Sequence, residues 1–127
     1  MNPNDYYRLK SAEITEADVR LVAACMSDHV GEENAVRLEA LVKRCGLGER
    51  QVRDILETLV KEYKWPIGAH AGKAGRWIIA NDKERWHVAN ELLSRENELR
   101  ARRRIIEQAH LPAKLELDKQ VPQLGLF

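Results

Sequence analysis

The chain has 127 residues, of which 44% are hydrophobic and 32% are charged, a profile that excludes a wholly disordered protein and predicts one helix-rich globular domain with extensions. Twenty-one basic and twenty acidic residues leave a formal net charge of +1, so overall charge offers no argument for nucleic-acid binding. The sequence has no signal peptide and no apolar run long enough to span a bilayer, so we expect a cytoplasmic protein without membrane contact.

The cysteines and histidines do not suggest a metal site. Cys25 and Cys45 lie far apart, each within an apolar helical stripe, so we interpret them as reduced core residues. The four histidines have no ligand spacing with one another or with either cysteine. The sequence also lacks a nucleophile–base pair, a phosphate-binding loop and a matched carboxylate pair, so we expect neither a cofactor nor an enzyme.

The first predicted helix follows an N-terminal arm, residues 1–14. Thr15 offers a capping hydroxyl, and acidic residues follow in the first turn. Gly31 is expected to end this helix after about His29. The apolar residues that recur at helical spacing are Val19, Val22, Ala23, Met26 and Val30.

Two short amphipathic helices are predicted next, joined by a tight glycine turn. The first has apolar residues Leu38, Leu41, Val42 and Cys45, and the second has Val52, Ile55, Leu56, Leu59 and Val60. Gly46 suits a chain that leaves a helix with a positive φ, and Leu47 should point inward. This pattern is typical of a helix-turn-helix.

A β-hairpin is predicted after Tyr63. Residues 65–68 form an extended segment because a residue that precedes proline avoids helical angles, and residues 76–79 favour a strand. A loop of small residues lies between these two strands, and it includes His70 and Lys73. Trp65 and Trp77 flank the hairpin, and we expect both to pack in its core.

Residues 15–81 resemble the winged-helix family of DNA-binding domains. The residues that carry the resemblance are 41–45, Gly46, Val52, Ile55, Leu59, 65–68 and 73–79. It implies a winged helix-turn-helix with a small β-hairpin. With the segments that follow, we expect a mainly α fold in which this domain precedes a long C-terminal helix and a flexible tail. Winged helices also serve as protein–protein modules, so this resemblance bears more on fold than on function.

In that family the third helix enters the major groove and the wing touches the adjacent backbone. The resemblance therefore assigns to DNA the residues Glu49, Arg50, Gln51 and Arg53 of the third helix, with Lys73 and Arg76 of the wing. Arginine can fork onto guanine or hold phosphate, and Gln51 could read adenine. Asp54 and Glu57 on the same helix repel phosphate, which leaves open a merely solvated, salt-bridged surface.

A long helix is predicted for residues 82–110, with Asn81 or Asp82 as its cap. At 1.5 Å per residue it would extend about 40 Å, so its second half should project beyond the domain. Trp86 and Leu93 are expected to pack on the domain. A narrow apolar seam suited to a homodimer consists of Ala89, Leu92, Leu99 and Ile106, interrupted by Glu96 and Arg103.

A cluster of arginines on this helix permits a second interpretation. The residues that could contact the DNA backbone are Arg100, Arg102, Arg103 and Arg104. Alternatively, the cluster is a solvated face with i, i+4 partners, such as Glu96 with Arg100 and Glu98 with Arg102. The seam and the cluster are compatible, so we expect a dimer with a basic surface.

Residues 111–127 have no period and contain two prolines, so we expect an extended, flexible tail that could reach about 50 Å. The tail finishes with Gln123, Leu124, Gly125, Leu126 and Phe127. These five residues resemble the motif by which proteins bind bacterial sliding clamps. The resemblance implies that Gln123 hydrogen-bonds at the pocket rim, that Leu124 packs at its edge, and that Leu126 and Phe127 fill the apolar pocket.

Together these features suggest a non-enzymatic accessory factor of bacterial or phage DNA replication or repair. Its partners would be duplex DNA and the sliding clamp. Two alternatives stay open: a dimeric winged-helix transcriptional regulator whose tail packs on the domain, and a protein adaptor that does not bind DNA.

Overall fold

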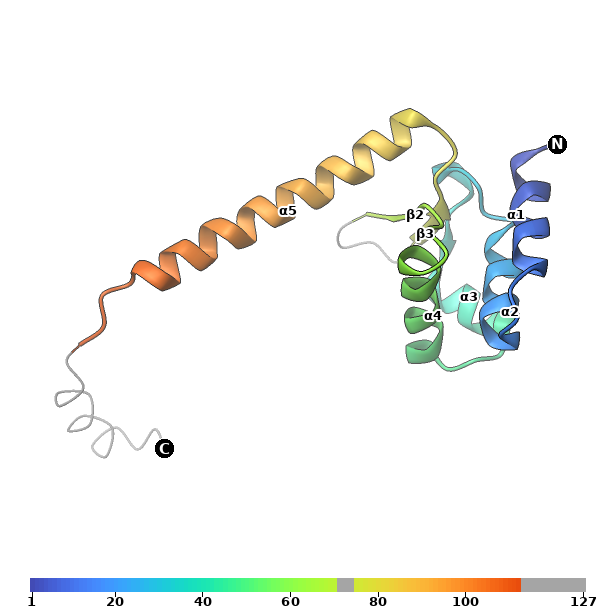
Figure 1. Ribbon diagram of the computed structural model, residues 1–127, viewed down its shortest axis with the longest axis horizontal. Coiled ribbons are helices and arrows are strands. Elements are labelled where there is room, and N and C mark those ends of the chain that lie inside the picture. The colour runs from blue at the N-terminus through green and yellow to red at the C-terminus, as the bar shows by residue number, and fades with distance from the viewer. Residues whose placement is uncertain (71–74, 113–127) are drawn as a thin grey trace. The chain divides into compact units, whose positions relative to one another are not determined.

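The computed structural model describes residues 1–70 and 75–112, and this part of the chain is mainly helical with a small antiparallel sheet (Figure 1). Its α-helices are α1 (Pro3–Ala12), α2 (Ala17–Met26), α3 (Leu38–Cys45), α4 (Glu49–Lys61) and α5 (Asp82–Gln108). Its strands are β1 (Val36–Arg37), β2 (Ile67–Ala69) and β3 (Gly75–Ile78), and a short 3-10 turn, η1, spans Glu32–Asn34. The contacts divide the chain into residues 1–93 and 94–127, with the boundary inside α5.

Helix α1 lies in the segment that we expected to be an arm. Asn2 caps it by accepting the Asp5 N–H at 2.9 Å, and Pro3 occupies the first turn, where a missing N–H costs nothing. Tyr7 packs edge-on against Trp65, with ring centroids 5.0 Å apart. Residues 1–14 are therefore part of the folded domain.

Helix α2 begins one residue later than expected. Glu16, not Thr15, stands at its N-cap, and no side chain caps it. The helix ends at Met26, and Gly31 instead opens the η1 turn with a φ of +94°. This positive φ is a conformation that residues with a Cβ rarely adopt, so the backbone angle favours glycine.

The helix-turn-helix prediction is confirmed. Helix α3 ends at Gly46, whose φ of +70° is the left-handed C-cap that glycine adopts without strain, and α4 starts after Gly48. Leu47 packs against the core, as expected. The core joins α2, α3 and α4 to the sheet, and its fully enclosed apolar side chains include Val22, Met26, Leu41, Val52, Leu59 and Ile78.

The sheet has the order β1-β3-β2, with both pairings antiparallel. The hairpin of β2 and β3 was expected, and Trp65 and Trp77 are buried at 6% and 1% exposure. Strand β1 was not expected, because two residues are too few for a recognisable period. It precedes α3 and pairs with β3, so the order from α2 to β3 is that of a winged helix-turn-helix.

Two residues in the first turns of α5 attach it to the rest of unit 1–93. Asn81 caps the helix by accepting the Glu84 N–H at 2.9 Å, as expected. The buried Glu84 carboxylate accepts the Glu32 N–H at 3.2 Å and the Ala80 N–H at 3.1 Å. Val88 lies over β2, where a Cβ on Gly68 would come within 3.1 Å of its Cγ2.

The expectation that Trp86 and Leu93 pack on the domain is wrong. They are 64% and 51% exposed, respectively. The face of α5 that docks is instead the one with Glu84 and Val88. A buried glutamate replaces the large apolar contact because two backbone N–H groups need an acceptor there.

We predict that Glu84→Ala lowers the free energy of unfolding by about 1–3 kcal/mol, because it leaves two backbone N–H groups without their acceptor. Glu98→Ala removes the same charge from an exposed position of α5 and should change stability by less than about 0.5 kcal/mol. Urea denaturation followed by circular dichroism measures both. If both variants change the free energy of unfolding equally, the hydrogen bonds of Glu84 do not stabilise the fold.

Candidate nucleic-acid interface

The buried face of α4 determines which side chains point outward. That buried face consists of Val52, Ile55, Leu56 and Leu59. Because these residues follow the helical period, Arg50, Gln51 and Arg53 fall between them on the solvent side, near the N-terminus of the helix. These three residues are exposed, and so is Glu49, which the resemblance also assigns to DNA.

Two of these three side chains already have partners within the domain. Gln51 Nε2 donates to Asp18 Oδ2 of α2 at 2.8 Å. Arg53 Nη2 lies 3.2 Å from Glu49 Oε1, and both side chains are more than half exposed. Exposed pairs one helical turn apart contribute only about 0.3–0.5 kcal/mol, so a phosphate can replace Glu49. Arg50 has no ion pair with any residue in the described part of the chain.

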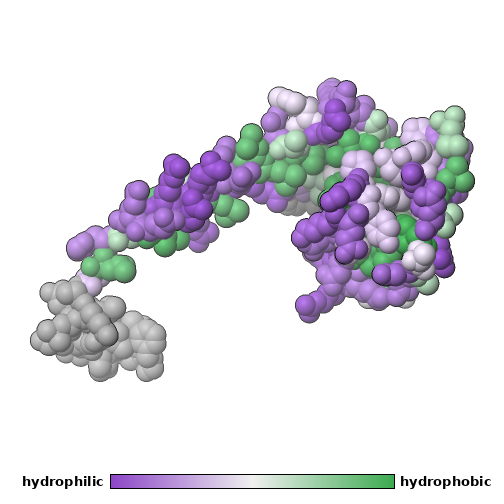
Figure 2. All heavy atoms as spheres, in the orientation of Figure 1, coloured by the Kyte–Doolittle hydropathy of each residue, from purple (hydrophilic) through white to green (hydrophobic). Residues whose placement is uncertain are grey.

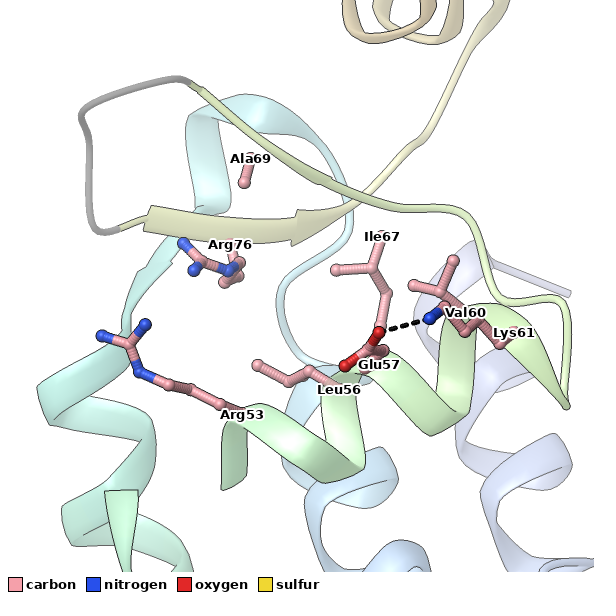
Figure 3. Close-up of a pocket in the computed structure, with 8 residues that line it drawn as sticks. All are labelled: Arg53, Leu56, Glu57, Val60, Lys61, Ile67, Ala69 and Arg76. Atoms are coloured by element: carbon pink, nitrogen blue, oxygen red, sulfur yellow. Dashed lines mark hydrogen bonds and ion pairs between the residues drawn. The ribbon is translucent and has the colours of Figure 1, made fainter. Parts of the chain in front are cut away.

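A groove of about 310 Å³ lies between α4 and the hairpin (Figure 3). Leu56 and Ile67 line its apolar part, while Arg53 of α4 and Arg76 of β3 lie on the same side of it. Burial, and then repulsion from Arg53, lower the pKa of the Arg76 guanidinium from its ordinary value. Two neighbouring cations form a site that an anion such as phosphate would stabilise.

The acidic side chains of α4 only partly oppose the binding of an anion near Arg53 and Arg76. Glu57 forms an ion pair with Lys61 on the other side of the groove, and this hydrogen bond lowers the pKa of the Glu57 carboxyl (Figure 3). Lys61 therefore offsets the charge of Glu57. Asp54 is exposed beside the predicted contact residues and has no such ion pair in the described part of the chain.

The predicted DNA-contacting arginines of α5 lie in a different unit from the α4 residues. Arg100, Arg102, Arg103 and Arg104 belong to residues 94–127, the second unit. Arg100 Nη2 lies 3.6 Å from Glu96 Oε1, which confirms that expected pair. Arg103 Nε lies 3.0 Å from Glu107 Oε1 instead. The expected pair of Glu98 with Arg102 does not form within the described chain.

Several predicted site residues lie outside the described residues. Lys73 of the wing is one of them. The others are the residues of the clamp-binding motif, Gln123, Leu124, Leu126 and Phe127. Their roles stay predictions from the sequence.

The metal-ligating side chains of the described residues are dispersed, and both cysteines are buried. No three His, Cys, Asp or Glu side chains there gather closely enough to hold a metal ion. Cys25 and Cys45 are buried and free, and burial raises the pKa of the Cys45 thiol to about 12. No helix of the described chain has the length and apolarity needed to cross a membrane.

Comparisons of the chain with protein-family models, with curated proteins and with solved structures found no match. The winged-helix arrangement thus follows from the order of the elements and the pairing of the strands.

His70 at the base of the wing is a structural residue that the sequence did not suggest. Its Nε2 forms an ion pair with Glu32, and its Nδ1 lies 3.2 Å from Glu91 Oε1 of α5. The ring also packs against Trp77, with centroids 5.0 Å apart. Hydrogen bonds to Glu32 and then Glu91 raise the pKa of His70 above its ordinary 6.5. His70 therefore links η1, the wing and α5, and its protonated form strengthens both contacts.

Because the pKa of His70 is raised on folding, its contribution to stability is full below the pKa of an unfolded histidine and is lost as pH rises through the folded value. We predict that the unfolding free energy of the wild type falls between about pH 6 and pH 8.5 more than that of His70→Gln. Urea titrations at both pH values measure the difference. Parallel pH profiles would rule out the link, since the other three histidines are common to both proteins.

Proposed function

We propose that this protein is a non-enzymatic accessory factor of bacterial or phage DNA replication or repair, which binds duplex DNA through α4 and the wing and docks on the sliding clamp through its C-terminal residues. The observation that carries the DNA contact is the surface formed by Arg50, Gln51 and Arg53 beside Arg76. The clamp contact is supported by the motif at residues 123–127.

The charges on α4 and β3 suggest how the domain would hold DNA. Arg53 and Arg76 are close enough for the charge of one to perturb the other, so a single backbone phosphate could lie between them. Arg50 has no competing ion pair among the described residues and is available to a base edge or a second phosphate. Gln51 would have to release Asp18 before it could read adenine.

We predict that Arg50→Ala and Arg53→Ala each weaken binding to duplex DNA by about 1–3 kcal/mol if the arginine contacts a base. If the arginine contacts a phosphate, each substitution should lower the slope of log binding constant against log salt concentration by about one in magnitude. Fluorescence anisotropy with a labelled duplex at several salt concentrations measures both quantities. The matched control is Lys10→Ala, which removes one positive charge from α1.

Arg53→Lys distinguishes a contact that needs only positive charge from one that needs the planar guanidinium fork, because lysine keeps the charge but loses the fork. If wild-type protein shows no salt-dependent binding, or if Lys10→Ala weakens binding as much as the α4 variants, the α4–wing surface is not the DNA contact.

The tail would supply a weak and reversible second contact. Full burial of Leu124, Leu126 and Phe127 contributes roughly 1.5–3 kcal/mol each. Fixing the backbone of each residue that binds opposes this by about 1–2 kcal/mol, so the net affinity should be modest. Such a weak contact becomes effective when the same molecule also holds DNA that passes through the clamp.

We predict that Leu126→Ala/Phe127→Ala weakens binding to a purified bacterial clamp at least tenfold, because two apolar anchors are removed. The matched control, Leu115→Ala/Leu117→Ala, removes two apolar residues upstream of the motif and should bind as the wild type does. Anisotropy of the labelled full chain measures the affinities. Equal binding by the two variants, or no binding by the wild type, would contradict clamp docking.

A dimeric winged-helix transcriptional regulator is the second candidate function. The exposed apolar residues of α5 favour it, since Leu99 and Ile106 are 66% and 65% exposed. That function requires sequence-specific DNA binding and no clamp binding. A chain that binds the clamp but no DNA would instead be a protein adaptor.

A further inference from the structure

The second half of α5 has no packing partner in the described chain. Every residue from Leu92 to Pro112 is exposed, and apolar side chains alternate with charged ones along the surface of this helix (Figure 2). An isolated helix of about 12–15 residues is marginal in water, because most helical stability in proteins comes from a packed apolar face. Ion pairs such as Arg103 with Glu107 add only a few tenths of a kcal/mol each. This segment therefore needs another surface.

The apolar residues of the segment form a seam with a seven-residue repeat. Leu92, Leu99 and Ile106 are 55%, 66% and 65% exposed, and their spacing is that of helices paired in a coiled coil. Between them on the same side of the helix stand Glu96 and Arg103, which are also exposed. The apolar positions are symmetric about Leu99, whereas the charge changes sign across it.

This charge pattern distinguishes the two orientations in which a pair of copies could form. In a parallel pair Glu96 would face the partner's Glu96, and Arg103 would face the partner's Arg103, which places like charges at the seam. In an antiparallel pair centred on Leu99, each Glu96 lies near the partner's Arg103. The same arrangement sets each Leu92 near the partner's Ile106.

We propose that α5 pairs with the α5 of a second copy in an antiparallel orientation, with Leu99 at the centre and the Glu96–Arg103 pairs on either side. This pairing goes beyond the proposed function. Only its consequence rests on that function, namely that two joined copies would carry two DNA-binding domains and two clamp-binding tails. The partners that these two side chains have now, Arg100 and Glu107, are exposed pairs that exchange readily.

The neighbouring arginines do not decide the orientation. Arg95, Arg100 and Arg102 flank the seam, and a like-charged arginine approaches from the partner in either arrangement. Their side chains are long enough to extend into solvent at the edge of the pair. The seam charges at Glu96 and Arg103, which cannot move away as easily, therefore set the orientation.

Sedimentation equilibrium of the full chain tests the proposal. The wild type should form a dimer, and Leu99→Ala should raise the dissociation constant at least tenfold. Glu96→Gln should raise it about three- to tenfold, because each copy loses an opposite-charge neighbour, whereas the control Glu98→Gln should leave it unchanged. The double swap Glu96→Arg/Arg103→Glu should dimerise as tightly as the wild type, because each seam charge again meets its opposite in the antiparallel pair. A parallel pair predicts the reverse for Glu96→Gln, a tighter dimer through loss of repulsion.

Cysteine crosslinking gives an independent answer. Glu96→Cys chains mixed with Arg103→Cys chains should form a disulfide-linked heterodimer, and Glu96→Cys chains alone should not crosslink. Efficient crosslinking of Glu96→Cys alone would overturn the antiparallel orientation, and a wild type that stays monomeric at high micromolar concentration would overturn pairing itself. Neither result depends on DNA or the clamp, so failure of the proposed function would be recognised separately by anisotropy with a labelled duplex or with a purified clamp.

Discussion

Burial of one apolar face of α4 is the constraint on which the rest of the molecule depends. Val52 and Leu59 are fully enclosed against α2, α3 and the sheet, so the helix cannot rotate without exposing its core residues. Arg50 and Arg53 are directed outward by that same packing, and β3 brings Arg76 to the same groove. The left-handed turn at Gly46 fixes where α4 starts after α3. Although the net charge of the whole chain is only +1, α4 and β3 place Arg53 and Arg76 beside one groove.

The two proposed contacts use different parts of the chain, the α4–wing surface for DNA and residues 123–127 for the clamp. The α4–wing surface is built on rigid elements, which favours binding to a partner of regular shape such as duplex DNA. The residues proposed to reach the clamp are one glutamine and three large apolar residues in a polar, proline-containing sequence. Each contact is expected to be modest, so the two together would select a clamp that already encircles DNA. Pairing through α5 would strengthen both contacts by the same principle.

Much of the fold could be predicted from local pattern, and the exceptions have physical causes. The period of Val52, Ile55 and Leu59 predicts α4 and its exposed face, because helical geometry alone relates them. Helix α1 also has a local signal that could have predicted it, since Asn2 is a typical N-cap residue and Pro3 a typical first-turn residue. The roles of Glu84 and His70 could not be predicted, because each depends on partners distant in sequence. Similarly, the exposed position of Arg53 follows from the period, but its proximity to Arg76 follows only from the pairing of β3 with β2.

The central claim is that DNA and the clamp bind at two separate places on one chain. Amide NMR of the isotope-labelled full-length protein tests this most directly, with titration first by a short duplex and then by a purified clamp. The account predicts that duplex perturbs resonances of residues 49–53 and of Arg76, and that the clamp perturbs residues 123–127 without reversing the first set. Perturbation of the same residues by both partners, or DNA-induced changes confined to α1 and α2, would contradict it.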